Sequence, residues 1–344
     1  MPVTGSLAEA VAEHRGALLP VGDLPAVPGA SVREVTVPGP PGAPRVLLRV
    51  YRPDGIGDAL PSVLWVHGGG FCLGNVDSVH TGAAQAALAA RAVVVAVSYR
   101  LAPEHPFPAG LDDCWAALEW VAGHPGELGA DPSRLAVAGA SSGGCLAAGL
   151  TLLARERGGP ALCFQHLSTP VLDDRLTTGS MTAFTDTPIW NRRLAEESWS
   201  LYLGPRSGPV PEHAAPARAE DLSGLPPAFL STAGLDPLRD EGLEYGLRLA
   251  RAGVPVEVHN FPGAHHAFGG PSTPHEQRRI ALEHLDALRR GLNPAPRPEP
   301  APRPDPAPRP DPASRLDTAP RPDPTRRFGP TPRPDAGPSA ATAV

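Results

Sequence analysis

The stretch Gly139-Ala140-Ser141-Ser142-Gly143 decides the fold of this sequence. An apolar run precedes it and a run of small residues follows it, which predicts a strand, a sharp turn and a helix. A turn this tight leaves almost no room for side chains, so glycine is needed on both sides of its apex. The turn lifts the serine hydroxyl clear of the sheet and places it at a helix N-terminus, where negative charge is stabilised.

Runs of strand length alternate with helical segments along most of the chain. This alternation predicts an α/β fold with a mostly parallel, twisted sheet and helices on both faces. The first two expected strands flank a Pro/Gly-rich connection, which predicts an antiparallel hairpin. The expected strands are 32–37, 46–51, 62–66, 92–99, 135–138, 161–167, 227–232 and 254–261. The expected helices are 7–19, 82–92, 111–122, one ending near 155, 240–252 and 274–292. Residues 171–222 interrupt the alternation.

Composition argues against several classes of protein. The 344 residues are 41% hydrophobic, enough for a core, and a net charge of −6 with no basic stripe disfavours nucleic-acid binding. No apolar stretch is long enough to span a membrane. The four cysteines show no C-x-x-C spacing. We therefore expect free thiols in a reducing compartment, and we predict a cytoplasmic location.

Residues 294–344 repeat the pattern Ala-Pro-Arg-Pro-Asp-Pro and hold 17 of the 46 prolines. With almost no large apolar side chains, this segment cannot bury enough surface to offset chain entropy. We predict a disordered tail, partly in polyproline II form, outside a catalytic domain at 1–293. The tail is a candidate ligand for a proline-recognition module, although a solvated spacer is the favoured interpretation.

A serine nucleophile needs a general base, and the base needs an orienting acid. In this fold the expected chain order is serine, acid, histidine, with the acid and the base on loops after later strands. Asp236 and His266 occupy such positions. Asp236 could instead cap a helix, because it precedes a proline, and Asp240 is the fallback acid. His265 and His266 are adjacent, so only one of them can face Ser141 easily.

The glycine run 68–70 follows a predicted buried strand and offers backbone N–H groups with no side chains in the way. Acyl transfer builds negative charge on the former carbonyl oxygen, and each well-placed N–H stabilises it by about 3–4 kcal/mol. We predict an oxyanion hole made by Gly68, Gly69 and the N–H of Ser142. An ordinary glycine turn is the alternative. No pair of histidines has zinc-protease spacing, so we predict no metal. Two-step hydrolysis by a serine nucleophile needs no cofactor, so we predict none.

Taken together, these features resemble the bacterial hormone-sensitive-lipase-like esterases of the α/β-hydrolase fold. The resemblance spans about residues 45–290 and rests on five motifs: His67–Phe71 (HGGGF), Tyr99–Ala109 (YRLAPEHPFPA), the serine turn followed by Gly144, Asp236–Asp240 (DPLRD), and Gly263 with His266 and Phe268. The family places its histidine two residues before the phenylalanine. The resemblance therefore selects His266 over His265.

The resemblance implies a serine carboxylesterase that hydrolyses small, short-acyl esters through an acyl-enzyme intermediate. The arrangement of the residues favours Ser141 as nucleophile and Asp236 as acid, and the resemblance adds His266 as base. The resemblance also implies a helical cap, formed by about residues 1–30 and 171–222. The candidate walls of the acyl pocket are Phe71, Trp190, Trp199 and Tyr202.

The chain departs from the family pattern at the serine turn. Ala140 and Ser142 stand where the family usually has aspartate and alanine, while the nucleophile and the glycines are kept. We therefore expect catalysis to survive. The missing carboxylate removes a charge beside the serine. We expect this to change the neighbouring hydrogen bonds or the pH optimum. The N-terminal segment is also short, so the sequence does not decide whether the cap closes over the site.

Other functions are compatible with the same residues. An amide or lactam hydrolase would use the same triad. A non-catalytic receptor of this fold, like the plant gibberellin receptors, would lack the histidine that is present here. An interaction protein recruited through the tail is a further alternative. A homodimer is one assembly that the sequence allows.

Overall fold

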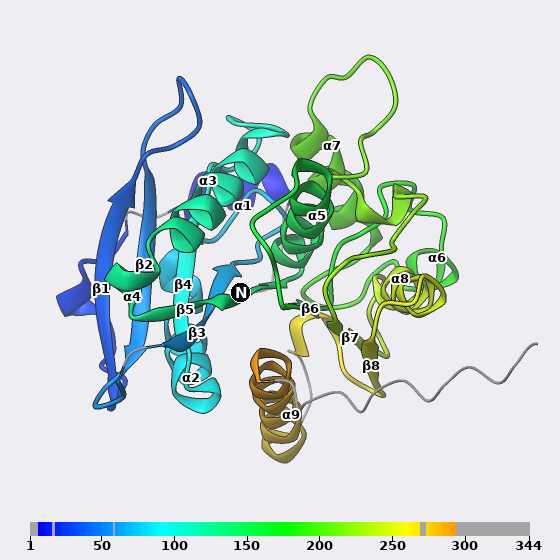
Figure 1. The fold of residues 1–344 in the computed structure, drawn as a ribbon. Helices are drawn as coiled ribbons and strands as arrows, with labels where there is room; N and C mark the ends of the chain where they lie inside the picture. Colours follow the sequence, from blue (N-terminus) through cyan, green and yellow to red (C-terminus); the bar gives the residue numbers. More distant parts are fainter. Residues whose placement is uncertain (1–5, 16–17, 58, 269–272, 294–344) are drawn as a thin grey trace, which may run out of the picture. The chain divides into compact units, whose positions relative to one another are not determined.

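The computed structural model describes residues 6–15, 18–57, 59–268 and 273–293. Within these ranges, eight strands form one sheet in the order β1-β2-β4-β3-β5-β6-β7-β8 (Figure 1). The strands are β1 (Ala30–Val37), β2 (Val46–Pro53), β3 (Leu60–Val66), β4 (Val93–Ser98), β5 (Ala130–Ala140), β6 (Phe164–Ser168), β7 (Ala228–Ala233) and β8 (Val256–Phe261). The predicted tail at 294–344 lies outside the described residues.

The sheet is mostly parallel, as the alternation of strands and helices predicted. Strands β3 to β8 pair in parallel, and β2 runs antiparallel to both of its neighbours. The predicted hairpin is the pair β1–β2, in register from Ala30 opposite Pro53 to Val37 opposite Val46. Strand β4 reads VVVAVS and is almost wholly buried. A valine-rich strand of this kind is typical of a parallel sheet covered on both faces.

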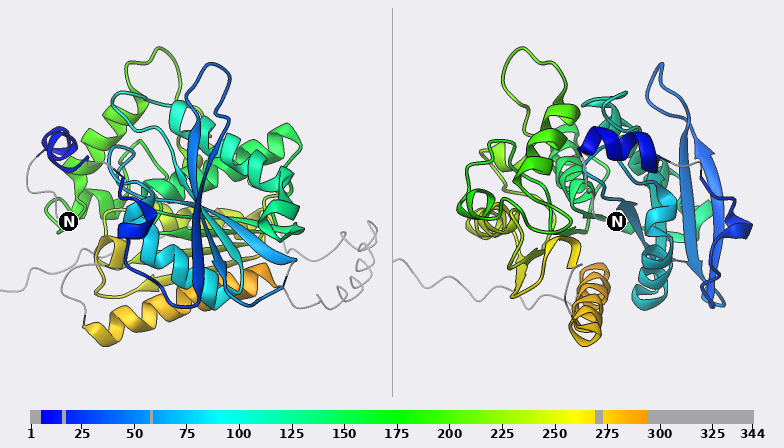
Figure 2. Two further views of the ribbon diagram at one scale, coloured as in Figure 1. Left: turned by 90° about the vertical axis from the view of Figure 1, so that its left-hand side faces the viewer. Right: turned by 180° about the vertical axis from the view of Figure 1, so that it is seen from behind.

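Helices cover both faces of the sheet. Helices α2 and α9 contact each other on one face, whereas α3 and α5 contact each other on the opposite face (Figures 1 and 2). Helix α8 packs against β7 and β8. The α-helices of the described residues are α1 (Leu7–His14), α2 (His80–Ala90), α3 (Ala109–Gly123), α4 (Pro125–Leu128), α5 (Ser142–Arg157), α6 (Gly179–Ala183), α7 (Arg192–Leu203), α8 (Arg239–Arg251) and α9 (Pro274–Leu292).

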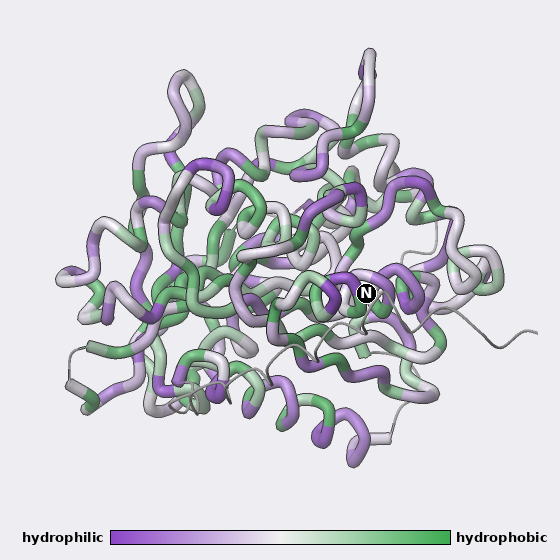
Figure 3. The backbone as a smooth tube through the Cα atoms, turned by 45° about the vertical axis from the view of Figure 1, so that its right-hand side comes forward, coloured by the Kyte–Doolittle hydropathy of each residue, from purple (hydrophilic) through white to green (hydrophobic). Residues whose placement is uncertain are grey.

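The core is built along the central strands and the helix that follows the serine turn. Helix α5 is buried from Ser142 to Ala154, and its glycines and alanines allow the helix to approach the sheet closely. Figure 3 shows hydrophobic segments crossing the middle of the described structure, whereas α9 alternates between hydrophobic and hydrophilic residues. Such alternation is typical of an amphipathic helix with one face on the core and the other in water.

Helix α1 is shorter than the predicted helix over 7–19. It begins at a capping box in which Ser6 and Glu9 bond each other's backbone N–H groups, and it ends at His14. Arg15 then leaves the helical conformation, and its guanidinium binds the carbonyl of Cys72 at 2.8 Å. The same guanidinium forms an ion pair with Glu104. These long-range contacts override the local helical preference.

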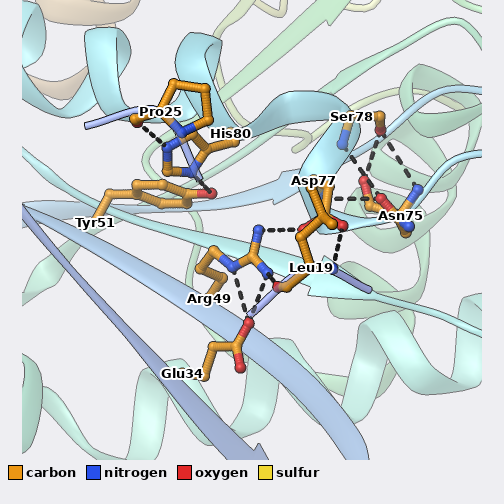
Figure 4. A network of polar contacts seen from close by, with 9 residues as sticks. All are labelled: Leu19, Pro25, Glu34, Arg49, Tyr51, Asn75, Asp77, Ser78 and His80. Atoms are coloured by element: carbon orange, nitrogen blue, oxygen red, sulfur yellow. Dashed lines mark hydrogen bonds and ion pairs between the residues drawn. The ribbon is translucent and has the colours of Figure 1, made fainter. Parts of the chain in front are cut away.

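A buried polar network ties the N-terminal segment to the start of α2 (Figure 4). Arg49 on β2 is completely buried and forms ion pairs of 2.6 Å with both Glu34 and Asp77. The N–H of Leu19 donates to Asp77 at 2.9 Å. Nearby, His80 bonds the carbonyl of Pro25 and the hydroxyl of Tyr51. The network holds residues 19–25 against the sheet.

None of the helices in the described part of the chain combines the length and the apolar character needed to cross a membrane. The four cysteines are free thiols, and three of them are buried.

Candidate active site

Ser141 lies between β5, which ends at Ala140, and α5, which begins at Ser142. Its φ of 57° and ψ of −124° are strained for a residue with a side chain. The end of β6 and the segment that follows it hold this backbone in place. The N–H of Ser141 donates to the carbonyl of Ser168 at 2.9 Å, and its own carbonyl accepts from the N–H of Val171 at 3.1 Å.

The glycines on either side of the turn have no room for a side chain, as predicted. A Cβ atom on Gly139 would lie 2.1 Å from the carbonyl oxygen of Gly143. A Cβ atom on Gly143 would lie 2.2 Å from the carbonyl oxygen of Val66. Both distances are far inside van der Waals contact. The turn therefore lets β5, α5 and the end of β3 meet within one small volume.

The structure brings Ser141, His266 and Asp236 together. His266 Nε2 lies 2.9 Å from Ser141 Oγ, and His266 Nδ1 lies 2.7 Å from Asp236 Oδ2. The other carboxylate oxygen, Oδ1, accepts the N–H of Leu238 at 3.0 Å. A neutral imidazole that carries its proton on Nδ1 satisfies both contacts, because a carboxylate only accepts. Nε2 is then free to accept the serine proton. All three side chains are buried.

The acid and the histidine stand on neighbouring loops at one edge of the sheet. Asp236 follows β7 and precedes α8, and His266 follows β8. The fallback acid, Asp240, has a different role in the structure: its carboxylate accepts the backbone N–H of Ser180 at 2.6 Å and so holds α6. Between the two adjacent histidines, His266 is the one that contacts Ser141.

The glycine loop lies directly beside the serine. A Cβ atom on Gly68 would lie 2.9 Å from the carbonyl oxygen of Ala140 and 3.3 Å from Ser141 Cβ. Gly69 adopts a φ of +127°, and a Cβ atom there would lie 2.1 Å from the carbonyl oxygen of Leu73. Ser142 is the first residue of α5, so its N–H has no partner within the helix. Backbone from two separate segments, the glycine loop and the start of α5, therefore lies beside Ser141.

The glycine loop is bound to the segment that was predicted to form part of the cap. Ser198 Oγ on α7 donates to the carbonyl of Gly70 at 2.9 Å. The indole of Trp190 would lie 3.0 Å from a Cβ atom on Gly70, and its ring centroid is 5.7 Å from that of His266. Trp190 is thus the predicted pocket residue that the structure brings next to His266.

The other three predicted pocket residues pack on one another. The rings of Phe71 and Tyr202 stack at 3.7 Å, and Trp199 lies 5.5 Å from Phe71. All three are buried. Burial raises the pKa of the Tyr202 hydroxyl well above its usual value, so it stays protonated. These residues form an apolar block that connects α7 to the glycine loop.

His67 begins the glycine loop but acts as a neutral, buried ring. It stacks on Tyr99 with centroids 4.3 Å apart, and the Tyr99 hydroxyl donates to the His67 carbonyl at 2.9 Å. Desolvation by burial lowers the pKa of His67 to about 4. The imidazole is therefore uncharged at neutral pH and positions the backbone beside it.

Sequence reasoning missed two buried polar residues that hold the loops of the site. One is Ser198, described above. The other is Glu241 on α8, whose Oε1 accepts the backbone N–H groups of Leu172 at 2.7 Å and Asp173 at 3.4 Å. A signal for Glu241 was present, because it stands on the buried side of an amphipathic helix, five residues after Asp236. Within the described ranges, no group of three or more His, Cys, Asp or Glu side chains is arranged to hold a metal ion.

Comparison with known proteins identifies the family. Residues 63–269 match the family described as the alpha/beta hydrolase fold. "Carboxylesterase NlhH" of Mycobacterium tuberculosis is 44% identical over 272 residues, which cover 78% of this chain and 85% of that protein. "Esterase LipI" of the same organism is 43% identical over 251 residues, covering 72% of this chain and 77% of the relative.

Solved structures agree with these relatives. A structure named "Bacterial Heroin Esterase" is 50% identical, covers 77% of this chain and 85% of its own, and superposes with a TM-score of 0.75. Esterase LipW from Mycobacterium marinum is 38% identical, covers 84% of this chain and 87% of its own, and gives a TM-score of 0.73. The chain therefore belongs to the α/β-hydrolase fold family and, within it, to the hormone-sensitive-lipase-like esterases.

Proposed function

We propose that this protein is a serine carboxylesterase that hydrolyses small, short-acyl carboxylic esters through an acyl-enzyme intermediate. The observation that carries the proposal is the chain of two hydrogen bonds from Ser141 Oγ through His266 to Asp236. The similarity to carboxylesterases supports the same reaction class. The contact between His266 and Ser141 favours a hydrolase over a non-catalytic receptor of the same fold.

In the first step, Ser141 Oγ attacks the ester carbonyl while His266 Nε2 takes its proton. The new C–O bond gives a tetrahedral intermediate, and the negative charge moves to the former carbonyl oxygen. Asp236 accepts the Nδ1–H bond throughout, so it orients the imidazole and stabilises the imidazolium. Gly68, Gly69 and Ser142 supply backbone N–H groups to the oxyanion.

The imidazolium of His266 next protonates the alkoxy oxygen, and the alcohol leaves as the C–O bond of the ester breaks. This leaves the acyl group on Ser141. Water then attacks the acyl carbon while His266 Nε2 takes one of its protons. The second tetrahedral intermediate collapses, Ser141 recovers its proton from His266, and the carboxylic acid is released.

The preference for short acyl chains is supported by the aromatic side chains around the site. Trp190 stands against both the glycine loop and His266, so a bulky acyl group would meet the indole close to the reacting carbon. The rings of Phe71, Trp199 and Tyr202 pack against one another next to the glycine loop. We assign all four residues to the wall of the acyl pocket.

The test is a hydrolysis series of p-nitrophenyl acetate, butyrate, octanoate and palmitate with the wild-type protein and Ser141→Ala. We expect activity on the two short esters and a loss of several orders of magnitude in the variant, which keeps the wild-type melting temperature. Labelling by a fluorophosphonate probe should mark the wild type alone. Wild-type activity in Ser141→Ala would remove the assignment. Turnover of anilides or lactams in preference to esters would favour the amide-hydrolase alternative.

We also propose a cytoplasmic location, which the four free cysteines support. A homodimer and the capture of a proline-recognition module by the tail stay predictions from the sequence. Size-exclusion chromatography with light scattering on the full chain tests the homodimer. The same measurement with an added SH3 or WW domain, on the full chain and on a chain ending at residue 293, tests capture by the tail.

A further inference from the structure

Glu241 is a buried carboxyl that the reaction scheme does not use. It lies on the first turns of α8 and is 2% exposed. Its Oε1 accepts the backbone N–H groups of Leu172 and Asp173. Desolvation raises the pKa of Glu241 well above its usual value, and the neighbouring Asp173 and Asp236 act in the same direction. The bonds from the two backbone N–H groups act in the opposite direction, because they stabilise the charged carboxylate.

The two N–H groups that Glu241 holds belong to the segment that fixes the nucleophile. The N–H of Val171 donates to the Ser141 carbonyl at 3.1 Å. Pro170 packs on the first turn of α5. A Cβ atom added to Gly144 would lie 2.9 Å from the Cβ of Pro170. Because the backbone of Ser141 is strained, it keeps its geometry only where neighbouring contacts over-determine it. The segment 168–173 supplies those contacts.

The same end of α8 also fixes the triad acid. Asp236 Oδ1 accepts the N–H of Leu238, and the Asp236 carbonyl accepts the N–H of Arg239, the first residue of the helix. Helix α8 packs against β7 and β8, the strands that precede Asp236 and His266 (Figure 1). The N-terminal end of α8 therefore binds Asp236 directly. Through Glu241 it also binds the segment 168–173, which in turn holds the backbone of Ser141.

We propose that Glu241 is a positioning residue for ester hydrolysis, which ties the segment behind Ser141 to the helix that carries Asp236. This inference rests on the proposed function. Glu241 does not touch the substrate in this scheme. It sets the distance and direction between the serine and the imidazole, on which the rate of acylation depends steeply, because a displacement of about 1 Å can lower a rate by about 100-fold.

The test compares Glu241→Gln, Glu241→Asp and Glu241→Ala with the matched control Glu244→Gln, an exposed glutamate on the same helix. Glutamine keeps the acceptor in the same place. Aspartate keeps the carboxyl but withdraws it by roughly the length of one C–C bond, about 1.5 Å. The readouts are kcat and KM on p-nitrophenyl acetate, the pH profile of kcat/KM, the rate of fluorophosphonate labelling of Ser141, and the melting temperature.

We expect Glu241→Gln and Glu244→Gln to keep kcat within about 3-fold of wild type, with an unchanged pH profile. We expect Glu241→Asp and Glu241→Ala to lose about 10- to 100-fold in kcat and in labelling rate, with KM within about 2-fold. The proposal is overturned if Glu241→Asp keeps the wild-type kcat. It is also overturned if Glu241→Gln loses as much kcat as Glu241→Ala. If Glu241→Ala does not fold, Glu241→Asp decides the question.

The labelling rate separates this inference from the proposed function. If the wild type hydrolyses none of the esters but Ser141 is still labelled, the choice of substrate is wrong, and the labelling rates of the variants decide the role of Glu241. If the wild type is neither active nor labelled, both proposals fail. A rise in KM with unchanged kcat in Glu241→Asp also contradicts the proposal, because it points to substrate binding instead of positioning.

Discussion

Replacing Asp236 by asparagine removes one charge and almost no volume, and the contacts of this residue predict its effect. In the wild type, Oδ1 accepts from Leu238 N–H and Oδ2 accepts from His266 Nδ1–H. Asparagine offers only one acceptor to these two donors. If its oxygen stays on Leu238, its NH₂ group faces Nδ1, and the imidazole must carry its proton on Nε2. That tautomer points a proton at Ser141 Oγ and cannot act as the base.

Flipping the amide restores the productive tautomer but sets two donors against each other at Leu238, in a completely buried position. A buried donor left without a partner costs about 1–3 kcal/mol, and losing the charge-assisted bond to the imidazolium costs about 1.5–3 kcal/mol more. At 1.36 kcal/mol per factor of ten, the two effects together lower kcat by about 10²- to 10⁴-fold.

The assay measures kcat and KM of Asp236→Asn on p-nitrophenyl acetate, with the melting temperature as the control for folding. KM should stay close to the wild-type value. In the background of Ser141→Ala the same substitution should cause almost no further loss, because residues that act as one unit are strongly non-additive. A variant that keeps more than a tenth of the wild-type kcat would refute this reasoning, because one of the two donors would then have another acceptor.

Three further predictions concern the pH dependence, the glycine loop and the buried ion pairs. Burial lowers the pKa of His166 to about 4, so its contribution to stability is complete above pH 6.5 and is lost as the pH falls toward 4. The loss amounts to about 2 kcal/mol by pH 5. Burial also lowers the pKa values of His67 and His284, so His166→Phe should keep part of the acid sensitivity but lose about 2 kcal/mol less stability than the wild type between pH 7 and pH 5 in urea unfolding; an equal loss would assign this share to other groups. Gly68→Ala brings a Cβ atom to 2.9 Å from the carbonyl oxygen of Ala140, the residue before the nucleophile. We expect kcat to fall by about 10²-fold with little change in KM. A rise in KM with unchanged kcat would contradict this prediction. Arg49→Met should lower the free energy of unfolding by about 2–4 kcal/mol, less than for a fully buried pair because Glu34 and Asp77 reach solvent; urea unfolding with an unshifted midpoint would show that the network contributes nothing.

The parts of the fold that sequence could predict are those fixed by local sterics. Gly139 and Gly143 are needed because no side chain fits at the turn, and that requirement is visible in the sequence as two glycines around one serine. The parallel sheet followed from the alternation of strands and helices in the same way. The turn is decided within a few residues, whereas the parallel sheet was predictable because the alternating pattern repeats along most of the chain.

The features that could not be predicted depend on contacts between distant segments. The residues alone favoured Asp236 but kept Asp240 as the fallback acid, since both stand at the start of one helix. The structure places Asp236 in contact with His266. Helix α1 ends early because Arg15 binds Cys72, which is 57 residues away. Glu241 differs, because the amphipathic pattern of its helix did carry a signal. It was overlooked because buried glutamates are rare, so a glutamate on a helix is ordinarily assigned to the solvated face.

The bond from Ser198 to the Gly70 carbonyl sets a condition for protein engineering. Exchange of cap segments among related enzymes is an attractive way to change which acyl chains they accept. In this chain such a chimaera also replaces the hydroxyl that binds the glycine loop, for which we propose a role in stabilising the oxyanion. A grafted cap without a hydroxyl at position 198 would change kcat as well as the preference for acyl chain length. A fall in kcat would then be misread as a change in substrate preference.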